Sequence, residues 1–357
     1  MTPSEKKSPN PLVILSKAPH IKTNDTVSKI MWLVVLALAP SVFFSVYLFG
    51  LNTFFILLVA TLSALIAEAG IQWFLKKPIT IKDGSAFITG LLIGMNMPPE
   101  APVWMVVIGS FFGIIIVKQL FGGLGFNIFN PALAARAFLL ASWPVEMTTK
   151  WHKFSGNRVL ADNLENISMS PQAFDAISQA TPLAILKGGP ELYNLSQSQL
   201  YDLLLSSKML MFLFLGNIGG TIGETSALLL LIGGIFLLFR KIITWHIPVS
   251  FIGTVVFLAF FYYLATGHPS AHFLAFFHLL SGGLFLGAFF MATDMVTSPM
   301  TAKGMVLFGI GCGFITFVIR IWGGYPEGVS YSILLMNALV PLIDKFTKPK
   351  VFGVKKG

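Results

Sequence analysis

Ten apolar runs follow one another along this chain, and each is long enough, or nearly so, for a helix that crosses a membrane. They occupy residues 30–50, 53–75, 84–98, 103–121, 128–143, 221–239, 244–265, 272–293, 304–322 and 328–343. A bilayer core requires about 20 apolar residues per helix. Only 11% of the residues are charged, against about 25% in soluble domains. We therefore expect an all-α, polytopic membrane protein with about ten transmembrane helices.

Basic residues mark one side of the membrane. They precede the first run, follow the second and the sixth, and end the chain, as Lys6, Lys7, Lys17, Lys22, Lys29, Lys76, Lys77, Lys82, Arg240, Lys241, Lys345, Lys348, Lys350, Lys355 and Lys356. Cytoplasmic loops carry an excess of Lys and Arg, and ten crossings place all four groups on one side. We expect both termini in the cytoplasm, and the net charge of +9 then requires no nucleic acid partner.

The second half of the chain repeats part of the first at an offset of 200 residues. "WMVVIGSFFGIII" (104–116) matches "GMVLFGIGCGFIT" (304–316), glycines included. Such glycines also serve simply to pack helices closely, which is the alternative explanation. We favour a true repeat, and because five helices is an odd number, the two halves would be inverted. The predicted divisions are a cytoplasmic segment, repeat 1, an extracytoplasmic loop, repeat 2 and a basic cytoplasmic tail, at 1–29, 30–143, 144–220, 221–343 and 344–357.

Several charged residues lie in or beside the apolar runs, namely Glu68, Asp83, Lys118, Arg136, Glu224, Asp294 and Arg320. A charge at bilayer depth costs about 2.5 kcal/mol or more, so such residues favour a functional interpretation. Those near helix ends can instead reach the interface, and Asp83, Lys118 and Arg320 fit either interpretation. We predict an ion path through Glu68 and Asp294, with Asp83 as a third candidate.

Two glycine-rich stretches interrupt the apolar pattern, at 121–137 and 216–228. Irregular backbone at membrane depth is tolerated where it lines a cavity, and its free amides suit an anionic or amide-rich ligand. The short apolar run 209–215 beside the second stretch is expected to be re-entrant or interfacial. The sequence contains no nucleotide-binding glycine motif, no readable catalytic triad and no metal pattern. The single cysteine, Cys312, excludes an iron–sulfur cluster held by this chain alone.

The stretch "DAISQATPLA" (175–184) lies in the long polar segment between the two halves. A threonine followed by a proline is typical of a helix start, because Thr181 can cap the helix and Pro182 fits its first position. The pattern predicts a short helix from Leu183 to Lys187, ended by two glycines. Taken alone, it favours a structural role for Thr181.

Four other segments change that interpretation, because they resemble the NqrB/RnfD family of membrane flavoproteins. They read "ITIKDGSAFITGLLIGMNMPP", "FGGLGFNIFNPALAARAF", "IGETSALLLLIGG" and "ITWHIPVSF", and the likeness runs from about residue 20 to the C-terminus. In this family a flavin transferase uses FAD to attach FMN, through a phosphoester, to the last threonine of a D-x-x-[ST]-G-A-T motif. Asp175, Ser178, Ala180 and Thr181 match that motif, whereas Gln179 replaces the usual glycine. The resemblance implies covalent FMN at Thr181.

The chain is more similar to the Rnf-type branch than to the quinone-reducing branch of this family, because its N-terminal segment is short. This similarity implies a subunit of an ion-translocating oxidoreductase complex in a bacterial or archaeal cytoplasmic (inner) membrane. The complex would pass electrons between ferredoxin and NAD and translocate Na⁺ or H⁺. The implied partners include an FMN-carrying subunit and iron–sulfur subunits, without which the chain is not catalytic. The family also implies a second, non-covalent flavin such as riboflavin, which we expect near Asn127, Asn130, Arg136 and Glu224.

Three other functions stay open at this stage. One is the NqrB-type subunit of a Na⁺-translocating NADH:quinone reductase. Another, of a different class, is a channel or secondary transporter without a redox role, which inverted repeats and broken segments would also fit. The last is a scaffold subunit without a cofactor. The sequence decides neither the coupling ion nor the direction of electron flow.

Overall fold

The structure, a computed structural model of the chain, describes residues 25–149, 181–192, 201, 204–205, 207–216 and 218–348. These residues form helices and turns and contain no strand. The helices are α1 Val27–Phe49, α2 Leu51–Phe74, η1 Ile81–Asp83, α3 Ser85–Met95, α4 Val103–Phe111, η2 Phe112–Gln119, α5 Pro131–Ser142, α6 Pro144–Thr149, α9 Pro182–Leu192, α11 Ser207–Leu215, η3 Ile222–Glu224, α12 Ala227–Phe239, α13 His246–Ala265, α14 Ala271–Leu280, α15 Leu284–Leu286, η4 Gly287–Met291, α16 Ala302–Trp322 and α17 Val329–Phe346.

Five of these helices are long and apolar enough to cross a membrane: α1, α2, α13, α16 and α17. Helix α14 is followed, after a short break, by the helix that α15 and η4 form, and the two are bent by 59°. If they count as one span, the number of candidate spans is six. The other predicted runs contain shorter helices, α3, α4 with η2, α5 and α12. An all-helical, multi-pass membrane protein is thus confirmed, while the count of ten crossings stays a prediction.

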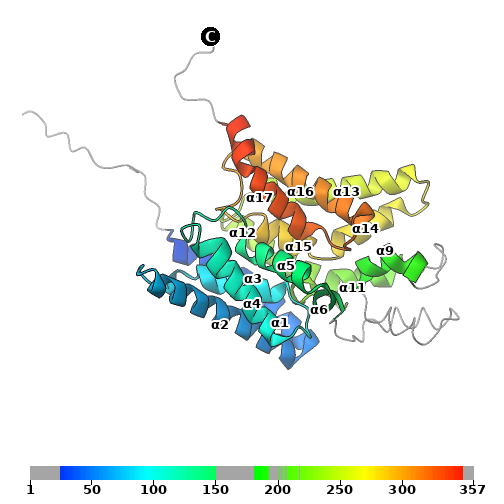
Figure 1. Ribbon diagram of the computed structural model, residues 1–357. Helices are drawn as coiled ribbons and strands as arrows, with labels where there is room; N and C mark the ends of the chain where they lie inside the picture. Colours follow the sequence, from blue (N-terminus) through cyan, green and yellow to red (C-terminus); the bar gives the residue numbers. More distant parts are fainter. Residues whose placement is uncertain are drawn as a thin grey trace, which may run out of the picture.

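The two halves of the chain share one pattern of helix neighbours. In the first half, α2 packs against α3 and α4, and α4 packs against α5; in the second, α13 packs against α14 and α16, and α16 packs against α17. The halves meet where α1 contacts α12 and where α5 contacts α17. Figure 1 shows α1 to α4 together at one side, α13, α14, α16 and α17 at the other, and α5, α12 and α15 between them.

The matched glycines themselves contact different neighbours. A Cβ atom on Gly109 would collide with Leu139 of α5, whereas a Cβ atom on Gly309 would collide with Ser250 of α13. Both glycines therefore permit a close helix approach, but in different directions. The glycine match by itself reflects packing chemistry, and the inverted repeat stays a prediction supported by the order of helix neighbours.

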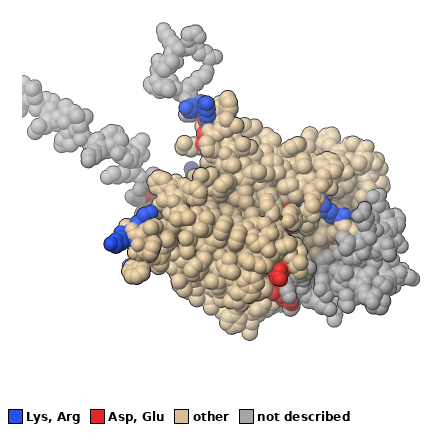
Figure 2. Space-filling model, in the orientation of Figure 1, with Lys and Arg blue, Asp and Glu red and all other residues tan. Residues whose placement is uncertain are grey.

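The described parts of the basic segments lie near one end of the bundle. Ser28, at the start of α1, donates to the carbonyl of Lys82, and Asp25 lies close enough to Arg240 for its pKa to be affected. Thr301 bonds to Thr347 at the end of α17. In Figure 2 most of the visible surface between the charged ends is uncharged, as a surface in contact with lipid would be.

Candidate functional site

Thr181 begins helix α9 and caps it. Its Oγ1 accepts a hydrogen bond from the amide of Ala184 at 3.2 Å, and Pro182 is buried at the first helical position. The predicted cap is confirmed, but the helix continues to Leu192 rather than ending at Lys187. The other motif residues, Asp175, Ser178, Gln179 and Ala180, lie outside the described residues, so their roles stay predictions.

Helix α9 is fixed to the bundle at two places. Leu183 and Ile185 are buried in an apolar cluster with Met209 and Leu213 of α11. On another side, the Nζ of Lys187 donates to the carbonyls of Ile319 and Tyr325, at 2.8 Å each. A cation near the C-terminus of a helix, here α16, is favoured by the helix dipole. Burial lowers the pKa of Lys187. These contacts hold Thr181 in a defined position.

Two hollows that share residues open beside Thr181, and we call them together the Thr181 pocket. Thr181, Glu224 and Glu327 line both, and the larger has a volume of about 50 Å³. Its wall also contains Arg136, Leu140, Met147, Thr148, Tyr325, Pro326, Ser330 and Tyr331. The threonine hydroxyl thus borders a hollow with three charged groups, and the rings of Tyr325 and Tyr331 stack on each other there.

Arg136 of α5 organises these charges. Its Nη2 forms an ion pair with Glu327 and lies 3.7 Å from Oε1 of Glu224, while its Nη1 donates to Asn96 at 2.8 Å. The amide of Gly283 donates to the other oxygen of Glu327, at 3.2 Å. Residues from several separate segments thus hold one guanidinium between two carboxyl groups, and only 5% of the Glu224 side chain is exposed.

Glu327 lies in the connection before α17, outside the membrane-spanning runs. Burial alone would raise its pKa, but Arg136, the bond to Glu224 and Arg320 outweigh burial, and the pKa of Glu327 is lowered. The arrangement favours an ionised Glu327 beside two guanidinium groups.

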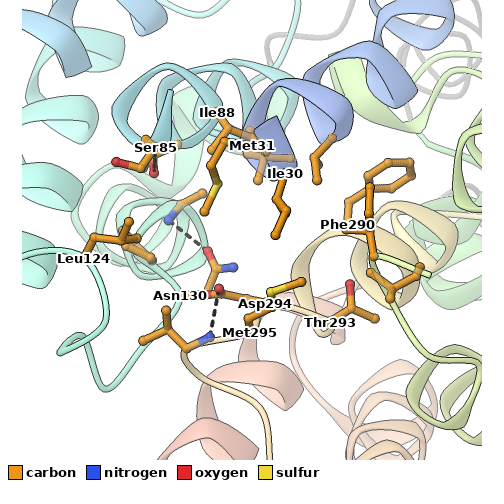
Figure 3. A pocket seen from close by; sticks show the side chains of 18 of the residues that line it. Ile30, Met31, Ser85, Ile88, Leu124, Asn130, Phe290, Thr293, Asp294 and Met295 are labelled. Atoms are coloured by element: carbon orange, nitrogen blue, oxygen red, sulfur yellow. Dashed lines mark hydrogen bonds between the residues drawn. The ribbon is translucent and has the colours of Figure 1, made fainter. Parts of the chain in front are cut away.

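A second hollow, the Asn130 cavity, lies between the starts of α1, α3 and α5 and the segment after η4 (Figure 3). Its volume is about 120 Å³. Asn130 caps α5 through the amides of Ala132 and Leu133 and donates to the carbonyl of Met291. Most of the other wall residues are apolar, among them Ile30, Met31, Val34, Ile88, Leu92, Leu124 and Phe290.

Asp294 and Asn127 also belong to the polar lining of this cavity. Asp294 accepts hydrogen bonds from the amide of Val296 and the hydroxyl of Thr297, and burial raises its pKa. The side-chain amide of Asn127 donates to the carbonyl of Phe129. The remaining polar lining residues are Ser85, Thr89, Lys118 and Thr293.

An ion pair is built into the wall of the Asn130 cavity. The Nζ of Lys118 donates to both oxygens of Glu68, at 2.9 and 2.8 Å, and to the hydroxyl of Ser85 at 2.7 Å. Ser85 in turn donates to Asp83, and Gln119 donates to Glu68. Lys118 and Ser85 line the cavity, whereas Glu68 lies behind them. This network links Glu68 to Asp83, two of the predicted ion-path residues, and the third, Asp294, lines the same cavity as Lys118 and Ser85.

Two of the charged residues in the apolar runs are buried within the protein. Lys118 and Arg320 are 1% and 3% exposed. Arg320 donates to the carbonyls of His278 and Ser281. Burial favours the functional interpretation for both residues, and that interpretation stays a prediction.

The four residues expected to hold the second flavin divide between the two sites. Asn127 and Asn130 line the Asn130 cavity, whereas Arg136 and Glu224 line the Thr181 pocket. Arg136 follows Asn130 by six residues, which is about 9 Å along a helix and enough to separate two sites. Sequence reasoning missed Glu327, although a charged residue before the last apolar run was a usable signal.

Comparison with known proteins supports the resemblance read from the motifs. A profile of the NQR2, RnfD, RnfE family matches residues 14–353. The chain is 47% identical over 350 residues to the D subunit of the proton-translocating ferredoxin:NAD(+) oxidoreductase complex of Clostridium ljungdahlii. It is 46% identical over 342 residues to the D subunit of the Na(+)-translocating ferredoxin:NAD(+) oxidoreductase complex of Acetobacterium woodii. Each match covers 96% of both chains. The D subunit of the ion-translocating oxidoreductase complex of Escherichia coli K12 is 38% identical over 367 residues, 96% of this chain and 99% of that relative.

Proposed function

Since this chain belongs to the NQR2, RnfD, RnfE family, we propose that it is the D subunit of an Rnf-type complex, an ion-translocating ferredoxin:NAD oxidoreductase. The full-length similarity to subunits with that name supports this proposal over the quinone-reducing branch. The chain would act as one subunit of a translocase and depend on FMN-carrying and iron–sulfur partner subunits. We place it in the cytoplasmic membrane with both termini in the cytoplasm, as the gathered basic segments favour.

Within the complex, we propose that Thr181 carries covalent FMN, attached by a flavin transferase. The observation that carries this proposal is the position of the Thr181 hydroxyl, which is fixed at the start of α9 and borders a charged pocket. A phosphate at a helix N-terminus is favoured by the free amides and the helix dipole. The unpaired Oε1 of Glu224 and the side chain of Arg136 would contact the flavin, which supplies the electron-transfer chemistry when bound.

A second, non-covalent flavin is proposed for the Asn130 cavity. Its mostly apolar walls with a few polar groups are typical of cofactor sites. The amides of Asn127 and Asn130 can pair with the donors and acceptors along the edge of a flavin ring. Arg136 and Glu224, which line the other pocket, are thereby reassigned from the second flavin to the covalent one.

The ion path is proposed to pass the Asn130 cavity. The hydrogen-bonded series of Asp83, Ser85, Lys118 and Glu68 supports it, together with Asp294, which lines the same cavity. The coupling ion is not decided by similarity. The relative named for proton translocation and the relative named for Na⁺ translocation are almost equally identical to this chain.

The test of the covalent flavin is a mass analysis of the peptide that carries Thr181, from the full chain expressed with a flavin transferase. We expect a mass increase equal to FMN less water. Thr181→Asn should remove it, because asparagine keeps the helix cap but offers no hydroxyl. Thr148→Ala is the matched control, since Thr148 lines the same pocket. An unmodified wild-type peptide, with the transferase active on a control substrate, would overturn the proposal.

A further inference from the structure

A further hollow, which we call the methionine groove, opens between the start of α13 and the start of α16, at the end of the bundle where the described basic segments lie. Its volume is about 250 Å³. The apolar residues that line it include Ile242, Ile243, Ile247, Met295, Met300 and Met305. Met295 and Met300 are 56% and 84% exposed, so the groove is open at the surface of the protein.

The methionine groove adjoins the Asn130 cavity. The residues that line both hollows are Ile242, Ile243, Thr293 and Met295, and Figure 3 shows the last two from the side of the cavity. The polar residues of the groove wall are Thr244, Thr293 and Ser298, and none of the described lining residues is charged. A ligand of this groove must therefore be largely apolar where it contacts the wall.

Lys241 lies at one edge of the groove and has an unusual backbone conformation. It directly precedes Ile242 and has a φ of 57°, at the end of α12. The amides of these two residues donate to carbonyls of the last turn of α12, in the Schellman arrangement that usually ends with glycine. A lysine in this conformation is disfavoured relative to glycine. The chain thus has a basic side chain at this edge against the preference of its backbone.

Lys303 lies at the other edge, between Met300 and Met305, in the first turn of α16. The first turn of a helix favours acidic side chains and disfavours a cation. Both lysines are exposed. Local structure favours neither of them, and residues that conflict with local structure are expected at functional sites.

The carboxylates at this end of the bundle do not neutralise the two lysines. Asp344 accepts the amide of Met300, Asp25 pairs with Lys29, and Asp294 accepts from the segment that follows it. In the described part of the chain no ion pair joins Lys241 or Lys303 to a carboxylate. The bond between Thr301 and Thr347 also brings the basic end of α17 to this side. An apolar groove with basic edges is complementary to an anionic amphiphile.

We propose that the methionine groove binds one anionic phospholipid of the membrane, with its phosphate near Lys241 and Lys303 and an acyl chain along the methionines and isoleucines. Basic pockets between transmembrane helices on the cytoplasmic side are typical sites for anionic headgroups. Methionine suits an acyl chain, because its side chain is flexible and adapts to irregular shapes. The inference goes beyond the proposed function and requires no flavin at either site.

The experiment uses the full chain in detergent and counts the retained phospholipids by native mass spectrometry, with phosphatidylglycerol and phosphatidylcholine as probes. In wild type we expect one phosphatidylglycerol to bind more tightly than phosphatidylcholine. Lys241→Gly should weaken its binding about 5-fold, the factor for the 1 kcal/mol that a basic residue contributes near anionic lipid. Because glycine suits the left-handed backbone, this variant should unfold no earlier than wild type.

Lys76→Gly is the matched control. Lys76 has the same charge and the same left-handed backbone, with a φ of 54°, at the end of α2, but it does not border the groove. This variant should keep the wild-type affinity. An equal loss of affinity in Lys76→Gly and Lys241→Gly would show general attraction to a basic surface and would overturn the proposed site.

Two further measurements test the other half of the site and the source of the phosphate. Lys303→Gln should weaken phosphatidylglycerol binding by a factor similar to that of Lys241→Gly. Glycerol 3-phosphate, which has the phosphate but no acyl chain, should not displace the lipid. Displacement by this compound would indicate a site for soluble phosphates and would overturn the inference, as would equal binding of both phospholipids by wild type.

A partner subunit is the other occupant that such a groove would fit, and the intact complex distinguishes it from lipid. A benzophenone side chain introduced at the exposed Met300 should form an adduct with phospholipid when membranes that contain the complex are illuminated. An adduct with a partner subunit, or none with phospholipid, would overturn the inference. The proposed function would still stand, because it depends on Thr181 and the Asn130 cavity.

Discussion

The Thr181 pocket and the Asn130 cavity differ in where their charged side chains lie. In the Thr181 pocket a guanidinium and two carboxyl groups lie directly on the wall. In the Asn130 cavity the strongest ion pair lies within the wall, with Lys118 at the surface and Glu68 behind it. The rest of that cavity's lining consists of two amides, one carboxyl group, three hydroxyl groups and mostly apolar side chains.

This difference suits the two sites to different chemistry. A ligand at Thr181 would carry a phosphoester charge and would lie beside Arg136 and two carboxyl groups. A ligand in the Asn130 cavity would be held as a neutral ring, and any charge it gained would act on Lys118 and Asp294. Because a protein tunes a cofactor through such neighbours, two flavins in these sites would have different redox properties.

The largest effect on stability is expected for Lys118→Met. The change leaves the Glu68 carboxylate buried without its cation, and breaking such a pair costs about 3–5 kcal/mol. Thermal unfolding of the purified chain in detergent measures the loss. Combining the change with Glu68→Gln should restore much of the stability. Lys29→Met, which breaks the exposed pair with Asp25, is the matched control and should unfold as wild type does. Equal unfolding of Lys118→Met and wild type would contradict the buried pair.

A smaller and more selective effect is expected for Asn130→Ala. The chain should lose the flavin that denaturation releases and keep the flavin bound at Thr181, because the two sites are separate. Removing the cap of α5 costs about 1 kcal/mol in addition. Asn130→Asp keeps the cap but removes the amide donor, so it should lose the same flavin with little loss of stability. Loss of both flavins in either variant would mean that the sites are not independent.

The fold could be predicted from the apolar runs to the extent that each run contains a helix. The boundaries were less predictable where tertiary contacts decide them. Helix α12 begins at Ala227 rather than at 221, because the preceding residues form a turn that brings Glu224 to the pocket. Helix α9 passes the two glycines that were expected to end it. Neither outcome follows from local sequence, since the contacts come from distant segments.

The candidate sites show the same limit. The sequence motif singled out Thr181, and the irregular segments singled out Asn130, Arg136 and Glu224. The partners of these residues were not readable, because Glu327 lies 191 residues from Arg136 and Lys118 lies 50 residues from Glu68. Spacing along the chain does not show which helices become neighbours. The sequence analysis therefore assigned Asn130, Arg136 and Glu224 to one flavin site, although they line two separate sites.

The smallest effect is expected for Lys187→Met, and it tests how independently the Thr181 pocket is held. The variant loses hydrogen bonds to the carbonyls of Ile319 and Tyr325, which in a partly exposed position is a loss of about 1 kcal/mol. Helix α9 should stay packed on the bundle because Leu183 and Ile185 remain buried, but its hydrogen bonds should open more often. Its amides should exchange with deuterium about 5-fold faster, the factor that 1 kcal/mol gives.

The exchange data also separate the two sites. Amides at the start of α5, beside the Asn130 cavity, should keep their wild-type exchange rates in Lys187→Met, because no contact of Lys187 reaches them. Lys208→Met, at an exposed position of α11, is the matched control and should change neither region. Faster exchange in both regions would mean that the two sites open together. The Thr181 pocket and the Asn130 cavity would then unfold as one cooperative unit, despite their different charges.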